Sequence, residues 1–290
     1  MREQESFSVS RSVMEAARIL AAVGVPEARR EAMSLVGHVM ARGRTFLITH
    51  PETELTPSQM RSLRQVVERR AGGEPLQYIT GHQEFYGLDF EVTPEVLIPR
   101  PETELLVEKA LELLDKEDRR ALICDDGTGS GCIPIALLHE RRALRAVGLD
   151  ISTGALRVAA RNAGRLGVGD RLRLAASDCF GALDRGSARF QMIVSNPPYV
   201  AEEALPGLQR EVREHEPQVA LTPGGDGLLI IRRLLAEAPL YLEPGGHLLM
   251  ELGFDQHEAV SQLTDARVWH LLGIHKDLQG IPRTVVLKRR

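Results

Sequence analysis

A short apolar segment that runs into a glycine-rich loop and then a helix constrains the fold of this chain most. Residues 121–125 resemble a buried strand, residues 127–131 read Gly-Thr-Gly-Ser-Gly, and residues 132–140 are helix-like. Glycines let the backbone turn sharply and approach a ligand closely, and the helix N-terminus offers free N–H groups to a polar ligand end. Such loops also serve dinucleotides or simply connect a strand to a helix, so the meaning of this one depends on the segments that come after it in the chain.

Two further strand-like segments end in residues that commonly bind ligands. Residues 145–149 lead to Asp150, about 20 residues beyond the loop, the spacing at which an acid binds a ribose in such folds. Residues 171–175 lead to Asp178, which is placed to accept from an adenine amino group, while Cys179 or Phe180 is placed to cover its ring. Acids at strand ends are also common turn formers. The joint pattern favours a site because ligands of open α/β sheets bind outside the carboxyl ends of strands.

The tetrapeptide Asn196-Pro197-Pro198-Tyr199 comes directly after a fourth apolar segment, residues 190–195. It is typical of methyl transfer to a planar nitrogen, whose delocalised lone pair must be held in place during attack. Asn196 can accept one N–H of the substrate, and carbonyls beside the two prolines can accept the other. Tyr199 can stack on the flat group. The alternative is a strand that ends in a Pro-Pro turn with an aromatic plug.

The alternation of segments predicts an α/β fold with a doubly wound, mostly parallel sheet. Residues 84–92 alternate around Gly87 and predict a β-hairpin, and a helix is expected from 102 to about 115. The first 80 or so residues predict helices, because apolar residues recur there at spacings of three and four. We therefore expect three regions, at 1–83, 84–101 and 102–290. The remaining predictions are strands at 246–252, 268–275 and 284–288, and helices at 13–23, 27–41, 57–71, 228–238 and 256–263.

Nearly the whole chain resembles the class I S-adenosylmethionine-dependent methyltransferases, and within them the HemK/PrmC release factor glutamine methyltransferases. The glycine loop and the Asn-Pro-Pro-Tyr tetrapeptide are shared with many nucleic-acid methyltransferases, whereas Ile-Pro-Arg-Pro-Glu-Thr-Glu and Gly-Ile-Pro-Arg are more specific. The resemblance rests on these and on Gly-Gly-Glu-Pro-Leu-Gln-Tyr-Ile at 72–79, Glu-Phe-Tyr-Gly-Leu at 84–88, Val-Leu-Ile-Pro-Arg-Pro-Glu-Thr-Glu at 96–104, Gly-Gly-Asp-Gly-Leu at 224–228 and Lys-Asp-Leu-Gln-Gly-Ile-Pro-Arg at 276–283.

The resemblance implies a Rossmann-like class I fold with a seven-stranded sheet whose last strand, 283–290, inserts antiparallel. It implies methylation of the glutamine amide in the Gly-Gly-Gln motif of class I peptide chain release factors, which supports translation termination. Residues 1–83 would dock the substrate, 84–101 would connect, and 102–290 would bind S-adenosylmethionine and catalyse. The catalytic residues would be Asn196, Pro197 and Tyr199, and Asn196 to Tyr199, including Pro198, would bind the glutamine. The cofactor would contact Gly127, Thr128, Gly129, Ser130, Gly131, Asp150, Asp178, Cys179 and Asn196.

Arginines of the first 80 residues form a second hypothesis about partners. Arg61, Arg64, Arg69 and Arg70 surround the third predicted helix. Such charges usually form a solvated face. Because the N-terminal domain of the resembled family helps to grip the release factor, we also consider a partly electrostatic docking surface.

Two residues of the loop region depart from the usual pattern of the resembled family. Asp126 stands where leucine is common, and Pro134 stands where alanine is common. Pro134 falls within the first helical turn, where N–H groups lack intrahelical partners, so it costs little. Asp126 ends a buried strand and must be paired, hydrated or protonated. Our hypothesis is that Asp126 weakens cofactor binding, although it could also approach the positive sulfonium.

Composition bounds the remaining possibilities. The chain has 290 residues, a formal net charge of −4 and three cysteines without paired spacing, and no apolar run of membrane length. These features predict a cytoplasmic protein without structural disulfides and without a membrane partner. Nine histidines are scattered without ligand spacing, so no metal is expected.

Two rival functions remain open at this level. The first is methylation of an exocyclic amine of adenine or guanine in DNA or RNA, for which the same tetrapeptide geometry serves. The acidic balance and the lack of an added recognition domain argue against direct nucleic-acid binding. The second is a binding module that senses S-adenosylmethionine without catalysis, for which only Asp126 argues.

Overall fold

The computed structural model describes residues 7–114, 121–185 and 189–290. It divides into two compact units, Met1–Gly81 with Arg210–His215, and His82–Gln209 with Glu216–Arg290. We call these the helical unit and the sheet unit. The first division falls close to the predicted boundary at residue 83, but the grouping of Arg210–His215 with the helical unit is not anticipated from the sequence. Residue 115, the predicted end of one helix, lies outside the described residues.

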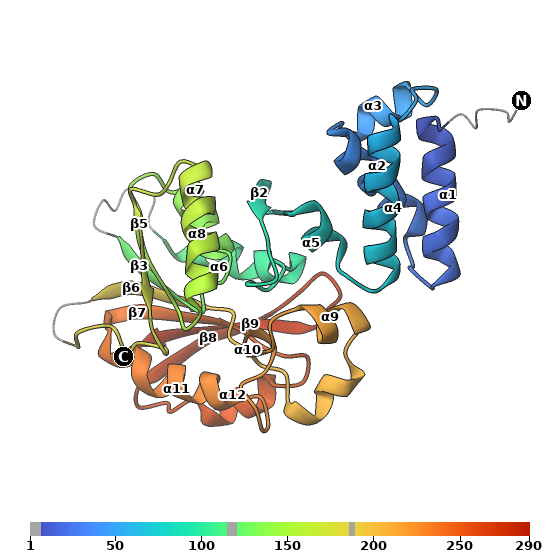
Figure 1. Cartoon of the computed structure of the whole chain (residues 1–290). Helices are drawn as coiled ribbons and strands as arrows, with labels where there is room; N and C mark the ends of the chain where they lie inside the picture. Colours follow the sequence, from blue (N-terminus) through green and yellow to red (C-terminus); the bar gives the residue numbers. More distant parts are fainter. Residues whose placement is uncertain (1–6, 115–120, 186–188) are drawn as a thin grey trace, which may run out of the picture. The chain divides into compact units, whose positions relative to one another are not determined.

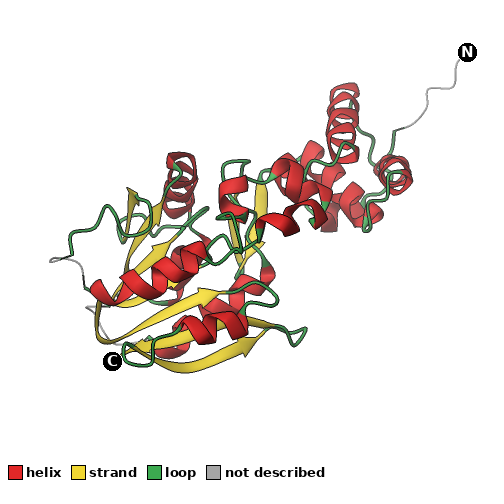
Figure 2. Cartoon of the chain, turned by 90° about the horizontal axis from the view of Figure 1, so that it is seen from below, coloured by secondary structure: helices red, strands yellow, loops and turns green. Residues whose placement is uncertain are grey.

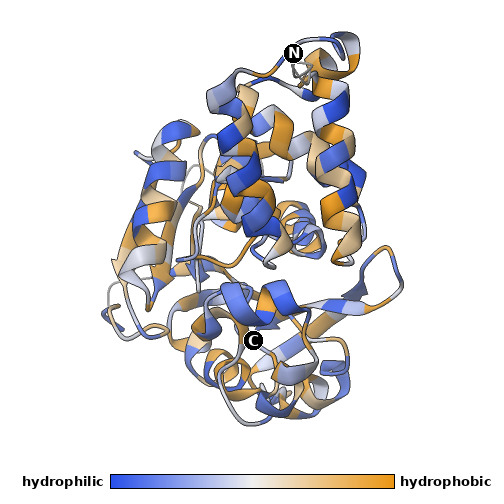
Figure 3. Ribbon diagram, turned by 45° about the vertical axis from the view of Figure 1, so that its right-hand side comes forward, coloured by the Kyte–Doolittle hydropathy of each residue, from blue (hydrophilic) through white to orange (hydrophobic). Residues whose placement is uncertain are grey.

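Amphipathic helices build the helical unit, and Figure 3 shows hydrophobic and hydrophilic residues alternating along their turns. Helix α4 begins with Pro57 after a capping box, in which Thr56 and Gln59 satisfy each other's backbone N–H groups. The apolar sides of α1, α2 and α4 enclose one core that includes Leu20, Leu35 and Leu63. The helices are α1 (Val9–Ala22), α2 (Ala28–Met40), α3 (Arg44–Thr49), α4 (Pro57–Ala71), α5 (Leu76–Thr80) and α9 (Arg210–His215).

A seven-stranded sheet dominates the sheet unit, as predicted (Figure 1). Its order is β5-β4-β3-β6-β7-β9-β8, and β9 is antiparallel to both neighbours, whereas the strands from β5 to β7 are parallel. The inserted antiparallel strand expected at 283–290 is thereby confirmed. The strands are β3 (Leu122–Asp126), β4 (Arg145–Asp150), β5 (Leu172–Ala176), β6 (Phe190–Ser195), β7 (Leu242–Glu251), β8 (Trp269–Lys276) and β9 (Pro282–Arg289).

Helices cover both faces of this sheet (Figure 2). Residues of α6, α7 and α8 share one core with one face, and residues of α11 and α12 share a second core with the other. The helical segments of the unit are η1 (Pro101–Thr103), α6 (Glu104–Leu113), α7 (Cys132–Glu140), α8 (Thr153–Arg165), η2 (Glu202–Gly207), α10 (Gln218–Leu221), α11 (Leu229–Glu237), η3 (Ala238–Leu240) and α12 (His257–Leu263). No helix among the described residues is long and apolar enough to cross a membrane.

The predicted hairpin also forms, from β1 (His82–Phe85) and β2 (Leu88–Glu91). Tyr86 and Gly87 both have positive φ, +53° and +73°, as a two-residue hairpin turn requires. Phe85 and Phe90 point from the two strands into the core and meet edge to face. The hairpin is therefore anchored to the sheet unit by burial of its aromatic residues.

The strand order brings the predicted site residues together. The order reverses between β3 and β6, and ligands of open α/β sheets bind at such a switch point. In the register of these two strands, Asp126 lies opposite Ser195, whose hydroxyl donates to the Asp126 carbonyl at 2.7 Å. The glycine loop after β3 and Asn196 after β6 consequently leave the sheet side by side.

Candidate active site

The glycine loop is held open by Asp150, at the end of β4. The N–H groups of Gly129 and Ser152 donate to its two carboxylate oxygens, each at 2.8 Å. Gly127 and Gly129 have φ of +76° and +54°, and a Cβ added at either would meet nothing closer than 3.9 Å. These glycines therefore supply the backbone turn and leave the space in front of the loop free for a ligand.

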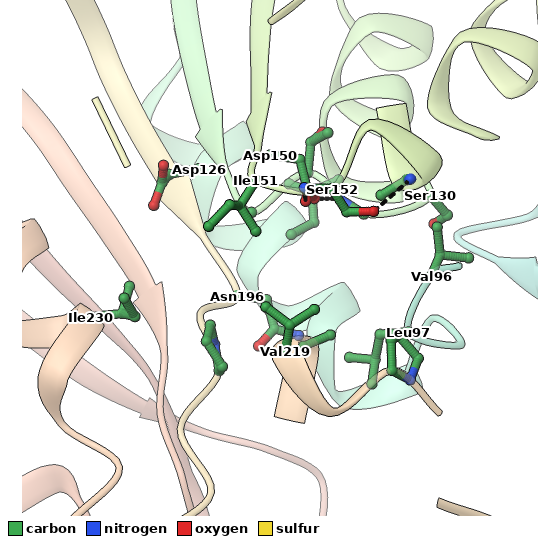
Figure 4. Close-up of a pocket in the computed structure, with 18 of the residues that line it drawn as sticks. Val96, Leu97, Asp126, Ser130, Asp150, Ile151, Ser152, Asn196, Val219 and Ile230 are labelled. Atoms are coloured by element: carbon green, nitrogen blue, oxygen red, sulfur yellow. Dashed lines mark hydrogen bonds between the residues drawn. The ribbon is translucent and has the colours of Figure 1, made fainter. Parts of the chain in front are cut away.

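A cavity of about 360 Å³ lies in front of this loop in the sheet unit. That volume is in the range of small-molecule sites. Figure 4 shows Leu97, Ile151, Val219 and Ile230 around it, so apolar side chains from four separate segments supply its walls. The predicted site residues that line it are Gly127, Thr128, Gly129, Ser130, Asp150, Asp178, Cys179, Asn196 and Pro198.

Three predicted site residues have other positions. Of the described residues, Gly131, Pro197 and Tyr199 are not among those that line the cavity. Gly131 precedes α7 with φ +81°, and a Cβ there would lie 2.9 Å from Ile135 and 3.2 Å from Ala159. Its place in the fold is a close packing point between α7 and α8 rather than a surface of the cavity.

Asn196 belongs to a chain of hydrogen bonds that runs through Thr103, which also lines the cavity, to Glu251, which does not. Its Nδ2 donates to Thr103 Oγ1 at 3.1 Å, and this hydroxyl donates to Glu251 Oε2 at 2.6 Å. The Tyr199 hydroxyl donates to the other oxygen, Glu251 Oε1, at 3.2 Å. Thr103 and Glu251 are 2% and 1% exposed. The Asn196 amide is thus held through its nitrogen by Thr103, which is in turn fixed by the buried Glu251.

The tetrapeptide backbone is fixed by contacts from three other segments, which contain Leu221, Gly227 and Gln256. Gln256 donates to the Tyr199 carbonyl at 2.9 Å, and Val200 N–H donates to the Leu221 carbonyl at 2.9 Å. A Cβ at Gly227 would lie 2.3 Å from the Tyr199 oxygen, so only glycine allows this approach. These hydrogen bonds and the close approach of Gly227 therefore hold the segment after Asn196 in one conformation.

Comparisons with known proteins agree with this architecture. A model described as the PrmC N-terminal domain matches residues 13–81, and one described as the methyltransferase small domain matches residues 102–262. A release factor glutamine methyltransferase from Koribacter versatilis is 44% identical over 267 residues, covering 92% of this chain and 93% of that one. The chain belongs to the release factor glutamine methyltransferase family. Another member, from Geobacter sulfurreducens, is 44% identical over 98% of both chains.

The solved structures show the same fold for this family member. A methyltransferase from Pyrococcus furiosus superposes with a TM-score of 0.51, covering 79% of this chain and 98% of that chain at 16% sequence identity. The class I methyltransferase fold expected from the sequence is thereby confirmed. S-adenosylmethionine is the methyl donor of this class of enzyme.

Two adjacent acids, Asp125 and Asp126, are buried at the end of β3, directly before the glycine loop. Asp125 is fully buried, and Asp126 is 5% exposed and lines the cavity. Burial raises the pKa of each to about 7, and the nearby charge of Asp150 adds to the effect at Asp126. Asp126 is therefore partly protonated near neutral pH. Pro134 is the third residue of α7, within the turn whose N–H groups have no intrahelical acceptor, as expected.

The segment after β5 separates the alternatives left open by the sequence. Cys179, which adopts φ +47°, lines the cavity, whereas Phe180 is fully buried and stacks on Tyr241. Burial raises the pKa of the Cys179 thiol to about 12, so it stays protonated. Asp178 lines the cavity too, but its carboxylate pairs with Arg233 at 2.6 Å.

The sequence reasoning missed Thr103 and Glu251 as members of the site. Thr103 lies inside the Ile-Pro-Arg-Pro-Glu-Thr-Glu motif, so its presence there was a signal. Glu251 ends an apolar strand, as Asp150 does, and the same rule of acids at strand ends would have found it. What the sequence could not show is that the two residues meet.

Proposed function

We propose that this protein transfers the methyl group of S-adenosylmethionine to the side-chain amide nitrogen of the glutamine in the Gly-Gly-Gln motif of class I release factors, and so supports translation termination. Membership of the family supports the reaction. The observation that carries the assignment of the site is the position of Asn196. Its amide is anchored through Nδ2, and it borders the same cavity as the glycine loop.

The residues around the cavity fit S-adenosylmethionine. Gly127 and Gly129 leave space for close approach of the methionine part. Each oxygen of Asp150 accepts one backbone N–H and keeps a lone pair for a ribose hydroxyl. Cys179 would cover the adenine and Asp178 would accept from its amino group. The cofactor supplies an electrophilic methyl group on a positively charged sulfur.

The protein's own contribution is to hold the glutamine amide. Asn196 Oδ1 would accept one substrate N–H while the carbonyls near Pro197 and Pro198 accept the other. Held in this way, the amide nitrogen would supply the electron pair of the new bond, and the cofactor would supply the methyl group, its sulfur keeping the electron pair of the carbon–sulfur bond. The proton leaves after nitrogen has become positive, so positioning and hydrogen bonding supply most of the acceleration.

Tyr199 takes part in this scheme as a predicted stacking partner. Its hydroxyl is bound to Glu251, and burial raises its pKa, with the charge of Glu251 as a further cause. The hydroxyl is thus neutral and fixed, so Tyr199 is unsuited to removing a proton. Its role would be to limit where the flat amide can lie.

The docking hypothesis changes once the helical unit is seen. Arg70 is buried and pairs with Glu31 and Glu211 at 2.5 and 2.8 Å, so it is a structural residue and not part of a docking surface. Arg69 pairs with Glu74. Arg61 and Arg64 are exposed on α4, and we propose them as docking residues in place of Arg70.

The docking proposal has a direct test. Changing both Arg61 and Arg64 to glutamate should raise the KM for intact release factor several-fold at low salt and leave the cofactor affinity unchanged. Arg142→Glu, an exposed arginine of the sheet unit, is the matched control. An unchanged KM in the double variant would contradict the proposal.

The reaction itself is tested with labelled S-adenosylmethionine. Wild-type protein is incubated with unmodified release factor, with release factor whose Gly-Gly-Gln glutamine is alanine, and with total tRNA and rRNA. We expect label only on the motif glutamine, and at least a hundredfold loss of rate in Asn196→Ala with cofactor affinity retained. Label on nucleic acid would overturn the substrate assignment, and cofactor binding without any label would overturn catalysis.

A further inference from the structure

The orientation of the Asn196 amide decides whether it can serve the proposed reaction. The oxygen and nitrogen of an asparagine amide are nearly equal in size, so the side chain fits its site in either of two orientations. One presents an acceptor to the substrate N–H, whereas the other presents two N–H donors that would repel it. Something in the protein must therefore choose between them.

The hydrogen bonds behind Asn196 make that choice. Each carboxylate oxygen of Glu251 accepts one hydrogen bond from a hydroxyl group, from Thr103 at 2.6 Å and from Tyr199 at 3.2 Å. A hydroxyl has a single hydrogen, and an ionised carboxylate can only accept. Because Thr103 gives its hydrogen to Glu251, only its lone pairs remain for Asn196, which must then donate through Nδ2 at 3.1 Å.

We propose that Thr103 and Glu251 are positioning residues that hold Asn196 with Oδ1 toward the substrate amide. Thr103 belongs to η1, Glu251 is the last residue of β7, and Asn196 directly follows β6. Glu251 is not among the residues that line the cavity, and Thr103, which does line it, would act on the substrate amide through its hydrogen bond with Asn196. The inference rests on the proposed function of the site, and it gives the Ile-Pro-Arg-Pro-Glu-Thr-Glu motif a role in setting hydrogen-bond direction.

Substitutions at Thr103 separate this role from simple packing. Thr103→Val keeps the shape of the side chain but removes the hydroxyl, whereas Thr103→Ser keeps the hydroxyl and removes the methyl group. We expect kcat to fall roughly ten- to a hundredfold in Thr103→Val, with the dissociation constant of S-adenosylmethionine unchanged. Thr103→Ser should restore most of kcat. Glu251→Gln should resemble Thr103→Val, because an amide can donate as well as accept.

The orientation itself can be measured without turnover. The chain contains only two asparagines, Asn162 and Asn196, so labelling with ¹⁵N-asparagine gives two pairs of side-chain amide signals in an NMR spectrum. We expect Thr103→Val to shift the Asn196 pair and speed its hydrogen exchange. Asn162 is an internal control, because its amide is held by the backbone of Glu91 and Ser130.

The outcomes distinguish the inference from the proposed function. A shift of the Asn196 signals in Thr103→Val, together with recovery of kcat in Thr103→Ser, supports positioning of Asn196 by Thr103 and Glu251. Unchanged Asn196 signals in Thr103→Val, or equal losses of kcat in the valine and serine variants, would overturn it. Absence of methylation by the wild-type protein would overturn the proposed function, while the NMR signals would still report whether Thr103 fixes the amide.

Discussion

Glu251 and Asp126 are both buried carboxyl groups at the carboxyl end of a strand in one sheet, yet their surroundings differ. Glu251 accepts two hydroxyl hydrogen bonds, and Arg283 adds a favourable charge. Asp126 faces the charges of Asp150 and Asp178, which are opposed by the cation Arg233 and by one hydrogen bond from the Cys179 thiol. Arg233 is itself paired with Asp178 and Glu237. The two carboxyl groups are therefore buried to a similar degree, but the surroundings of Glu251 stabilise its ionised form better than those of Asp126 do.

The pKa values reflect this difference. Burial raises the pKa of Glu251, but the hydrogen bonds from Thr103 and Tyr199 oppose the rise. Burial and the charge of Asp150 raise the pKa of Asp126 to about 7, although Arg233 and the hydrogen bond from Cys179 oppose the rise. The comparison shows that the number of hydroxyl donors and the sign of the neighbouring charges, and not burial alone, decide how stable a carboxylate is inside this protein.

The largest expected effect is the loss of a supported carboxylate. Glu251→Leu should lower the free energy of unfolding by about 3 kcal/mol, because two buried hydroxyl groups lose their acceptor. Urea unfolding at pH 8, followed by far-UV circular dichroism, measures it. A variant as stable as wild type would show that Glu251 is no better supported than Asp126.

The matching change at Asp126 should have the opposite sign. Asp126→Leu should raise the free energy of unfolding at pH 8 by roughly 2 kcal/mol, because it removes a buried carboxylate with little compensation. The same urea titration applies, with the exposed Asp170→Asn as a control for loss of one charge. Destabilisation by the leucine would mean that Asp126 has partners as effective as those of Glu251.

The dependence of stability on pH sharpens the comparison. The folded pKa of Asp126 is about 7 and its ordinary value is 3.8, so between these values the folded state binds more protons than the unfolded state. Stability therefore falls as pH rises through this window, by roughly 1 kcal/mol between pH 6 and pH 8 for one such acid. Asp126→Asn should therefore reduce the slope without abolishing it, because burial also raises the pKa of Asp125 to about 7. An unchanged slope in Asp126→Asn would refute the assignment.

The smallest expected effect concerns the cofactor. The sequence led us to expect that Asp126 weakens cofactor binding. Asp126→Leu should then lower the dissociation constant of S-adenosylmethionine by roughly threefold at pH 7, because binding no longer has to remove water from a partly ionised carboxyl group. Isothermal titration calorimetry measures the constant. A higher dissociation constant in the variant would instead show that the carboxylate attracts the positive sulfonium.

Local patterns were sufficient to predict much of the fold and part of the site. The predicted strand at 190–195 and the helix at 132–140 have the same bounds in the structure as β6 and α7, because apolar runs and glycine breaks act over a few residues. Gly127, Gly129, Asp150 and Asn196, which line the cavity, were also predicted this way, since each ends or follows a strand, whereas Gly131 was predicted with them but does not line it. Pattern reasoning missed the short helices α3, α5 and α9, whose sequences are too short for helical periodicity to show.

The sequence by itself determined the strand–loop–helix unit, the sheet class and the place of Asn196 directly after a strand, because those properties depend on residue type and on neighbours along the chain. Only the tertiary structure decided that Thr103 meets Glu251, 148 residues away, and that Gly131 serves helix packing. It also decided that Arg70 is buried against Glu211. Contacts at such separations depend on how whole elements pack, and no local spacing encodes them.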